Sequence, residues 1–200
     1  MRAIGFAAVA LLVTFMSGCS RVPGSGDKPV IDFGETQRTV LGPRIWSQRS
    51  GDLSSQFGRA VAVDSDGSVI VAGEFYGTMN FGCSDLTIPG GSFFPDTYVA
   101  KLSSSGGRLW SLQFNNSADG YAHGVALDSQ NNVYVVAEFL DRITLPFPCD
   151  PLSTAAFGNA NIVLAKFGPS GDCIKARECG DGPSSYGNGI AVDSFDSVTT

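Results

Sequence analysis

Residues 60–65 read AVAVDS, and close copies of this hexapeptide follow as GVALDS at residues 124–129 and GIAVDS at residues 189–194. The copies start 64 residues apart (124 − 60) and then 65 residues apart (189 − 124). A step this regular indicates a chain built from repeated structural units. The apolar run before the aspartate has strand character, and the residues that follow it tolerate turn dihedrals.

Other strand-like runs keep the same step. The matching segments are residues 69–75 (VIVAGEF) with 133–139 (VYVVAEF), residues 98–102 (YVAKL) with 163–167 (VLAKF), and Trp46 with Trp110. Turn residues separate the runs, as in DSDGS at residues 64–68 and SG at residues 105–106. Four antiparallel strands per repeat are the content of one β-propeller blade. The sequence therefore predicts an all-β protein, a β-propeller truncated to about two and a half four-stranded blades of about 64 residues.

We place the repeats at about residues 45–108, 109–172 and 173–200, the last one incomplete because it stops within its second strand. Since propellers close with roughly four to eight blades, we expect the rest of the ring to be missing; a small open array, or one closed by self-association, is the alternative. Each full repeat exceeds the usual blade length of about 40 to 50 residues. The surplus lies at residues 76–95 and 140–160, which we expect to form long loops on one rim, where a ligand surface would lie.

The whole string resembles the bacterial β-propeller repeat called SBBP. It runs from Gly-Val-Ala-Leu-Asp-Ser through Asn-Val-Tyr-Val and Val-Leu-Ala-Lys-Phe to a Ser-Gly turn and a Trp, and it covers about residues 45–200. The resemblance implies a secreted or surface propeller. The chain departs from the pattern where Asp96 is followed by Asn161, Trp110 by Lys175 and Gly73 by Ala137.

A weaker similarity links the chain to the tryptophan-docking pattern of quinoprotein propellers, through Ala100, Gly106 and Trp110. That family has Asp where this chain has Leu102. We therefore expect no quinone cofactor, and we expect Trp110 to pack between neighbouring blades.

The first 18 residues have the composition of an export signal. Arg2 precedes a short apolar stretch that ends at Met16, and the small residues Ser17 and Gly18 follow. The stretch is too short for a mature membrane helix. With Cys19 next, the segment resembles the lipobox of bacterial lipoproteins, with Met16 in place of the usual Leu. The resemblance implies that Cys19 is acylated, for example with palmitate, and becomes the new N-terminus; an ordinary signal peptide with a coincidental cysteine is the alternative.

Residues 19–44 are rich in Pro and Gly and carry few apolar residues, so we expect a flexible tether between the lipid and the folded part. The expected location is the cell envelope, with the protein lipid-anchored to a membrane and periplasmic or surface-exposed. By the rule of the lipoprotein family, Ser20 after Cys19 implies the outer membrane if the cell is Gram-negative.

The charge balance limits the partners. Without Arg2 the chain keeps 12 of its 13 basic residues against 19 acidic ones, a net charge of about −7 (12 − 19). An acidic surface repels phosphate backbones, so we expect no nucleic acid partner. The 25 glycines and 16% charged residues are typical of short strands joined by tight turns, and no long window has helical spacing.

Four cysteines remain beside Cys19, in a compartment that is normally oxidising, and they allow three full pairings. Cys173 and Cys179 are six apart on one expected strand, about 20 Å when extended, too far for a bond. Cys149 follows the second strand, and the fourth strand should end near it at Cys179. We therefore hypothesise a bridge between Cys149 and Cys179. Zinc is not expected, because no Cys-x-x-Cys spacing occurs and His123 is alone.

The recurring charged residues have mainly structural interpretations. We expect Asp64, Asp128 and Asp193 to cap their turns by accepting hydrogen bonds from backbone amides, with a calcium loop at Asp64 and Asp66 as the alternative. Glu74 and Glu138 recur together with Lys101 and Lys166, which suggests a cross-strand ion pair within each blade; a ring of ligands lining the channel is the alternative. We expect His123 to be surface or hydrogen-bonding filler.

The predicted function is a non-catalytic, membrane-tethered module that binds a protein or glycan partner. We assign no catalytic, cofactor-binding or metal-binding residue. The alternatives are a scaffold of an envelope assembly complex and a fragment of a propeller enzyme acting on glycans. A binder should expose aromatic residues on the two long loops, a scaffold an apolar patch on the side of the ring, and an enzyme inward-facing acids or histidines that break the repeat.

Overall fold

The computed structural model of the chain describes residues 46–82, 85–88, 92–154, 158–180 and 185–200. The export signal, the lipidation of Cys19, the tether and Cys83 lie outside these residues. The described residues form strands and turns without helix, and every strand pairing among them is antiparallel, so the all-β prediction is confirmed. Within the described segments there is also no helix of the length and hydropathy needed to cross a membrane.

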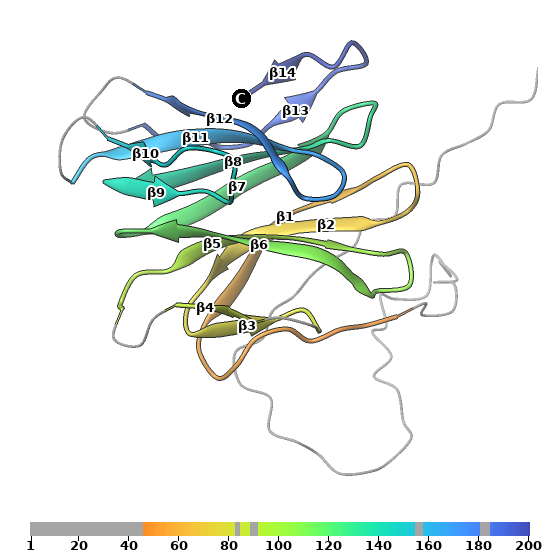
Figure 1. Cartoon of the computed structure of the whole chain (residues 1–200), viewed down its shortest axis with the longest axis horizontal. Helices are drawn as coiled ribbons and strands as arrows, with labels where there is room; N and C mark the ends of the chain where they lie inside the picture. Colours follow the sequence, from red (N-terminus) through yellow and green to blue (C-terminus); the bar gives the residue numbers. More distant parts are fainter. Residues whose placement is uncertain (1–45, 83–84, 89–91, 155–157, 181–184) are drawn as a thin grey trace, which may run out of the picture.

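Four strands that follow one another along the chain, apart from the insertions, form one antiparallel sheet in each of two periods (Figure 1). The fourth strand of each sheet is the segment that opens the next repeat under the boundaries predicted from the sequence, near residues 109 and 173. Sheet 1 contains β1 (Gln56–Val63), β2 (Val69–Phe75), β5 (Asp96–Leu102) and β6 (Arg108–Asn116). Sheet 2 contains β7 (Gly120–Leu127), β8 (Val133–Leu140), β11 (Ala160–Phe167) and β12 (Cys173–Cys179). The third copy of the repeat forms β13 (Ala191–Val192) and β14 (Val198–Thr199), which pair with each other.

The two ends of the sheets differ. Tight turns such as residues 64–68 and 103–107 lie together at one end, which we call the turn rim, and the two long insertions leave the sheets at the opposite end, the insertion rim (Figure 1). The insertions are more ordered than the loops expected from the sequence, because each contains a short hairpin. The hairpins are β3 (Thr78–Asn80) with β4 (Asp85–Thr87), and β9 (Arg142–Thr144) with β10 (Leu152–Ser153).

The second hairpin joins the sheet of the preceding repeat. β9 pairs with the end of β6 through Asn115 opposite Thr144 and Asn116 opposite Ile143. Sheet 1 is therefore extended to six strands in the order β1-β2-β5-β6-β9-β10. The first hairpin, β3 with β4, instead covers the face of sheet 1 that points away from sheet 2, through Met79 and Leu86.

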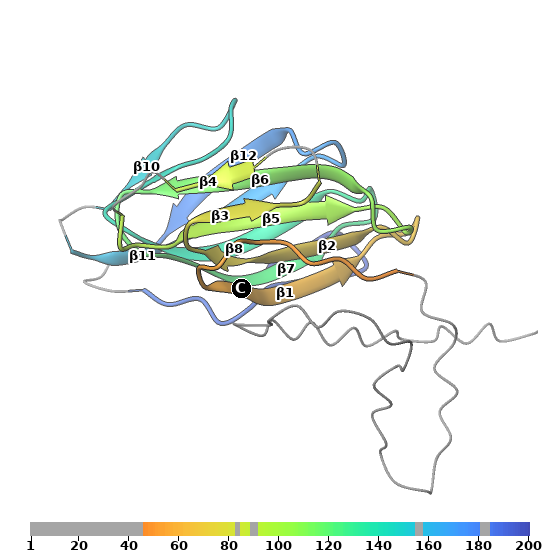
Figure 2. The ribbon, with the colours of Figure 1, turned by 90° about the horizontal axis from the view of Figure 1, so that it is seen from below.

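The two sheets pack face to face, with their first strands β1 and β7 in contact (Figure 2). Strand β2 shows how the alternation of side chains produces two cores: Ile70 and Ala72 point toward sheet 2, and Val69 and Val71 point to the opposite face. All are buried, which explains why this strand is apolar throughout rather than alternating. The core between the sheets also holds a stacked pair of rings, Phe114 of β6 and Phe167 of β11, 5.6 Å apart.

The aspartate turns form as predicted. In each copy, one carboxylate oxygen accepts hydrogen bonds from the amides two and four residues later, at 2.8 to 3.0 Å: Asp64 from Asp66 and Ser68, Asp128 from Gln130 and Asn132, and Asp193 from Phe195 and Ser197. The third residue after each aspartate has a positive φ between 61° and 78°, and these residues are Gly67, Asn131 and Asp196. Gly, Asn and Asp are the residues that tolerate this backbone region best, so the turn is encoded in each repeat.

Candidate functional site

The turn rim holds each lysine of the repeat against the aspartate of the turn. Lys101 Nζ lies 2.8 Å from Asp64 Oδ2, and Lys166 Nζ lies 3.0 Å from Asp128 Oδ2. The expected pairing of these lysines with Glu74 and Glu138 is therefore wrong. The strand register gives the reason, because Glu74 stands opposite Thr97, four residues along β5 from Lys101 and about 13 Å away.

Tryptophan side chains connect each sheet to the next at the same rim. Trp110 donates from Nε1 to the carbonyl of Pro169 at 2.9 Å, and its ring covers Gly171, where an added Cβ would lie 2.9 Å from the ring. The predicted packing of Trp110 between neighbouring sheets is confirmed. Trp46 makes the same contact one repeat earlier, with the carbonyl of Ser104 and with Gly106.

The turns of neighbouring repeats are also hydrogen-bonded to one another. Asn131 accepts from the amide of Ser65 at 3.2 Å and donates from its side-chain nitrogen to Ser65 Oγ at 2.7 Å. Asp196 accepts from the amide and hydroxyl of Ser129 at 2.8 and 2.7 Å. Because these contacts recur at equivalent positions, the turn rim has the role of a joint between sheets.

At the insertion rim the recurring glutamates have basic partners that the sequence did not reveal. Glu74, almost fully buried, accepts from Arg59 Nε at 2.8 Å, and Glu138 Oε2 lies 3.4 Å from His123 Nε2. Arg59 and His123 occupy the same repeat position (123 − 59 = 64), and each is the extra residue of a β-bulge. The presence of a basic residue at both positions was the feature of the sequence that could have predicted the contacts with Glu74 and Glu138. His123 therefore has a defined partner and is not only filler.

The pKa values of these groups follow from their surroundings. The hydrogen bond to Glu74 raises the pKa of Arg59. Burial raises the pKa of Glu138, although the neighbouring His123 acts in the opposite direction. In both pairs a buried glutamate lies against a basic side chain that is more exposed than the glutamate.

One aromatic side chain recurs in each copy of the repeat, at the second residue of β1, at the second residue of β7, and five residues before β13 (191 − 186). We call Phe57, Tyr121 and Tyr186 the first-strand row; they share one repeat position (121 − 57 = 64 and 186 − 121 = 65). Phe57 is 42% exposed and Tyr186 is 66% exposed. The guanidinium of Arg59 lies 5.2 Å from the ring centroid of Phe57.

Acidic groups surround the middle member of the row. Burial, together with the negative charge of Asp119 and Glu74 and the neighbouring phenol of Tyr76, raises the pKa of Tyr121 to about 12. Asp119 also acts on Glu138. Tyr121 thus lies near carboxylates that both sheets supply, Glu74 from sheet 1 and Glu138 from sheet 2.

The two insertions expose aromatic side chains. Phe93 is 88% exposed and its neighbour Phe94 is also exposed, in the segment after β4, while Phe147, between β9 and β10, is 92% exposed. These are the exposed aromatic residues that we expected of a binding protein.

The disulfide differs from the hypothesis. Cys149 is bonded to Cys173, with Cα atoms 5.7 Å apart, and Cys179 is free. We had assumed that the insertion stays at the rim where β12 ends. Instead, the segment after β9 runs back along β12 and meets the first residue of that strand.

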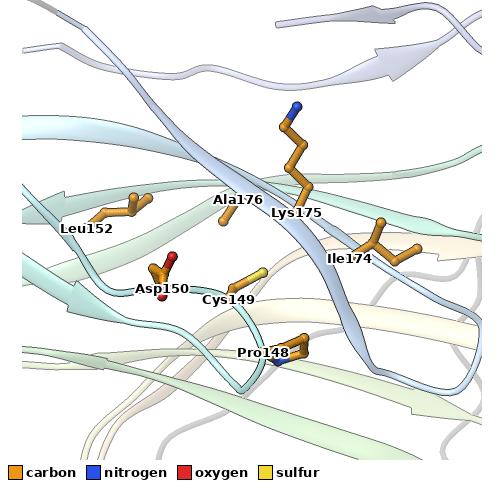
Figure 3. Close-up of a pocket in the computed structure, with 7 residues that line it drawn as sticks. All are labelled: Pro148, Cys149, Asp150, Leu152, Ile174, Lys175 and Ala176. Carbon is orange, nitrogen blue, oxygen red and sulfur yellow. The ribbon is translucent and has the colours of Figure 1, made fainter.

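A shallow cavity of about 280 Å³ opens between this segment and β12. Figure 3 shows Pro148, Cys149 and Asp150 on one side and Ile174, Lys175 and Ala176 on the other. Asp150 and Lys175 are its only charged lining residues. Among the described residues no group of three or more His, Cys, Asp or Glu side chains could hold a metal ion.

No family model matches the chain. The chain is similar to an uncharacterized WD repeat-containing protein of Acanthamoeba polyphaga mimivirus, with 32% identity over 109 residues. The similar segment is 49% of this chain and 8% of the viral protein, so the match covers a small part of that protein's length. WD repeats have four strands each, which is also the number of strands that each full repeat contributes to its main sheet here.

The recurring glutamates contact Arg59 and His123, while Phe57, Tyr186, Phe93 and Phe147 expose large parts of their rings to solvent.

Proposed function

We propose that the chain forms consecutive blades of a β-propeller of the SBBP type, anchored to the cell envelope through a lipid on Cys19, and that it binds a protein or glycan partner without turnover. The support for a propeller is the stacking of two equivalent four-stranded sheets with β1 beside β7, and the similarity to a WD repeat protein. Four antiparallel strands per radial unit are the content of a blade.

The observation that carries the binding function is the exposure of Phe93, Phe94 and Phe147 on the two insertions. A phenyl ring in water loses the free energy that burial would provide, about 1.5–3 kcal/mol for a side chain of this size. Aromatic side chains are enriched where a protein contacts a partner. Phe147 also stands close to the disulfide at Cys149, which fixes the segment and lowers the entropy cost of binding.

A scaffold is the second candidate, and one observation favours it. Leu109 and Ile174 occupy the same repeat position on β6 and β12 (174 − 109 = 65), and both are half exposed. A row of aliphatic side chains along the last strand of each sheet would suit a lateral protein contact.

An enzyme has less support. His123 breaks the repeat, since Arg59 stands at the equivalent position, but it faces Glu138 as Arg59 faces Glu74. The substitution therefore keeps a nitrogen-bearing side chain against the glutamate rather than introducing a separate acid or base.

The binding surface can be tested by photo-crosslinking in the producing bacterium. The full chain carries a benzophenone amino acid in place of Phe93, of Phe147 or, as a control on the turn rim, of the exposed Asp66. We expect discrete adducts from positions 93 and 147 and none from position 66. Equal labelling at all three positions, or no adduct from either insertion, would contradict the proposal.

The anchor is tested separately by metabolic labelling with a palmitate analogue. We expect label and membrane association in the wild-type chain and loss of both in Cys19→Ser. An unlabelled wild-type protein would refute lipidation and leave the binding surface to the crosslinking result.

A further inference from the structure

We infer that the face of sheet 1 that points away from sheet 2 docks a second copy of this chain, through the third unit of that copy, residues 185–200. The contact continues the stacking of the sheets from one molecule into the next. The inference rests on the proposed stacking of the sheets as consecutive blades, and it names a surface away from the exposed rings of the insertions. The apolar edge of this face is formed by Val61 and Val63 of β1, which are 39% and 52% exposed.

The chain already contains two examples of the contact that this face would make. Between sheets 1 and 2, Val125 of β7 packs in one core with the small residue Ala60 of β1. Between sheet 2 and the third unit, Ile190 lies against Gly124, where an added Cβ would be 3.0 Å from Ile190 Cγ2. Val125 and Ile190 share one repeat position (190 − 125 = 65), as do Ala60 and Gly124 (124 − 60 = 64). Each unit therefore places a branched side chain on a small residue of the unit before it.

Two members of this series remain open. Val61 is the residue of sheet 1 equivalent to Val125 (125 − 61 = 64), but it is 39% exposed where Val125 is 9% exposed. Gly189 is the small residue of the third unit (189 − 124 = 65), and a Cβ added there would meet nothing within 4 Å. The third unit and the far face of sheet 1 lie at opposite ends of the stack (Figure 1), so the two open positions meet only between two copies.

The turn rim of sheet 1 carries a joint of the kind that connects neighbouring sheets. Trp46 packs against the core on the far face of sheet 1, and it makes on the turn of sheet 1 the contact that Trp110 makes on the turn of sheet 2. Because Trp110 accompanies the sheet that packs on sheet 2, Trp46 marks the far face of sheet 1 as one that receives another sheet. The β3–β4 hairpin is compatible with this packing, since the β9–β10 hairpin contributes Ile143 to the core between sheets 1 and 2.

A second copy is the partner because the chain carries both halves of the contact. The branched side chains stand exposed on β1, and the small residues stand open on the third unit. The contact joins two different surfaces and is therefore heterologous. Such contacts form a closed ring if the rotation between copies allows it, and an open chain of copies if it does not.

The test uses the full chain, produced in the bacterium with two different affinity tags and solubilised in detergent, and it measures capture of one tagged copy by the other. Val63→Glu places a carboxylate on the β1 surface, and Ala191→Glu places one on the third unit. Both positions are exposed, so the variants should fold. Leu109→Glu, at a 51% exposed position on β6, is the matched control. Near-UV circular dichroism confirms that all three variants are folded.

We expect wild-type copies to capture one another. Capture of Val63→Glu by itself, and of Ala191→Glu by itself, should fall by about tenfold or more, because a carboxylate buried without a partner is costly. Val63→Glu mixed with Ala191→Glu should restore capture, since each variant supplies the surface that the other lacks. Leu109→Glu should behave as the wild type.

Absence of capture between wild-type copies would overturn the inference, as would undiminished capture of Val63→Glu by itself or failure of the mixed pair. A wild-type chain that captures a different protein through β1, but not its own copy, would also overturn it. Crosslinks from positions 93 and 147 report on the insertions alone, so a failure here is distinguishable from a failure of the proposed function.

Discussion

The turn rim and the insertion rim are built by the same repeat and differ in how faithfully it is kept. On the turn rim the first two copies make the same contacts: aspartate with lysine, tryptophan with a glycine turn, and serine with the next turn. On the insertion rim Arg59 becomes His123, and the two hairpins pack in different places. The comparison indicates that the joint between sheets lies on the turn rim, which leaves the opposite rim free to diversify.

The largest test of this comparison is Trp110→Ala. Trp110 is buried between the sheets, so its removal should lower the free energy of unfolding by about 3–5 kcal/mol. Phe147→Ala, on the insertion, should change it by less than about 0.5 kcal/mol because the ring is exposed. Urea unfolding of the two variants measures both effects. Similar decreases in the free energy of unfolding would contradict the view that the turn rim, and not the insertion rim, joins the sheets.

The next effect concerns the two lysines. The side chain of Lys101 is 7% exposed and that of Lys166 is 28% exposed. Lys101→Met leaves the buried Asp64 carboxylate without its cation and should cost about 2–3 kcal/mol. Lys166→Met should cost about 1 kcal/mol, since Lys166 is more exposed than Lys101 and Asn132 still donates a hydrogen bond to Asp128 Oδ2. A larger loss in Lys166→Met than in Lys101→Met would contradict this order.

Part of the loss of stability at low pH should come from Asp128, on the turn rim. Burial alone would raise the pKa of Asp128, but the hydrogen bonds from Asn132 and Lys166 outweigh it, so the pKa falls to about 2. The folded-state pKa is thus below the unfolded value of about 3.9. The stability from this group is complete above about pH 5 and is lost as the pH falls toward 2.

In Asp128→Asn, the difference between the free energies of unfolding at pH 7 and pH 3 should therefore shrink by about 1 kcal/mol. Urea midpoints at both pH values provide the measurement. An unchanged difference would show that Asp128 titrates alike in the folded and unfolded chain.

The smallest effect is expected for Asn131→Gly. The variant loses two side-chain hydrogen bonds to Ser65 but relieves a positive φ of 62°, so the free energy of unfolding should change by less than about 0.5 kcal/mol. The local effect should be clearer, with faster amide exchange at Ser65. Asp196→Gly is the matched control and should leave the exchange rate at Ser65 unchanged, because Asp196 makes the equivalent hydrogen bonds to Ser129. If amide exchange at Ser65 is unaltered in Asn131→Gly, the hydrogen bonds between Asn131 and Ser65 do not stabilise the contact between the two turns.

The repeat predicted the strands and turns well because those are local properties. Strand-like runs bounded by turn residues locate β1, β2, β5 and β6, and the capping role of Asp64 needs only the next four residues. The repeat also identified which residues are equivalent. It did not identify which end of a strand they share, and for that reason Lys101 was paired with Glu74 instead of Asp64.

The insertions were harder to predict because their pairing is not local. β9 has three residues, too few for a visible alternation, and its partner β6 belongs to sheet 1, whereas the strands on either side of the insertion belong to sheet 2. The path of the segment after β9, and with it the partner of Cys149, depends on that pairing.

One departure from the pattern has a compensation that only the structure reveals. In sheet 1 the Asp96 carboxylate accepts from the amide of Gln113 at 2.6 Å. In sheet 2 the roles are exchanged, and Asn161 donates to the carboxylate of Glu178, the residue equivalent to Gln113 (178 − 113 = 65). The difference between Asp96 and Asn161 therefore preserves the hydrogen bond.

The pairing of β9 with β6 also has a consequence for how such chains can be lengthened or shortened. The chain order and sheet 1 are out of phase, since the β9–β10 hairpin at the edge of sheet 1 lies in the chain between β8 and β11 of sheet 2. Deleting residues 120–179, which supply sheet 2, would strip the backbone partners from Asn115 and Asn116, whereas a cut placed after the β9–β10 hairpin would not. Units that are duplicated or grafted should therefore fold when the chain is cut after the β9–β10 hairpin.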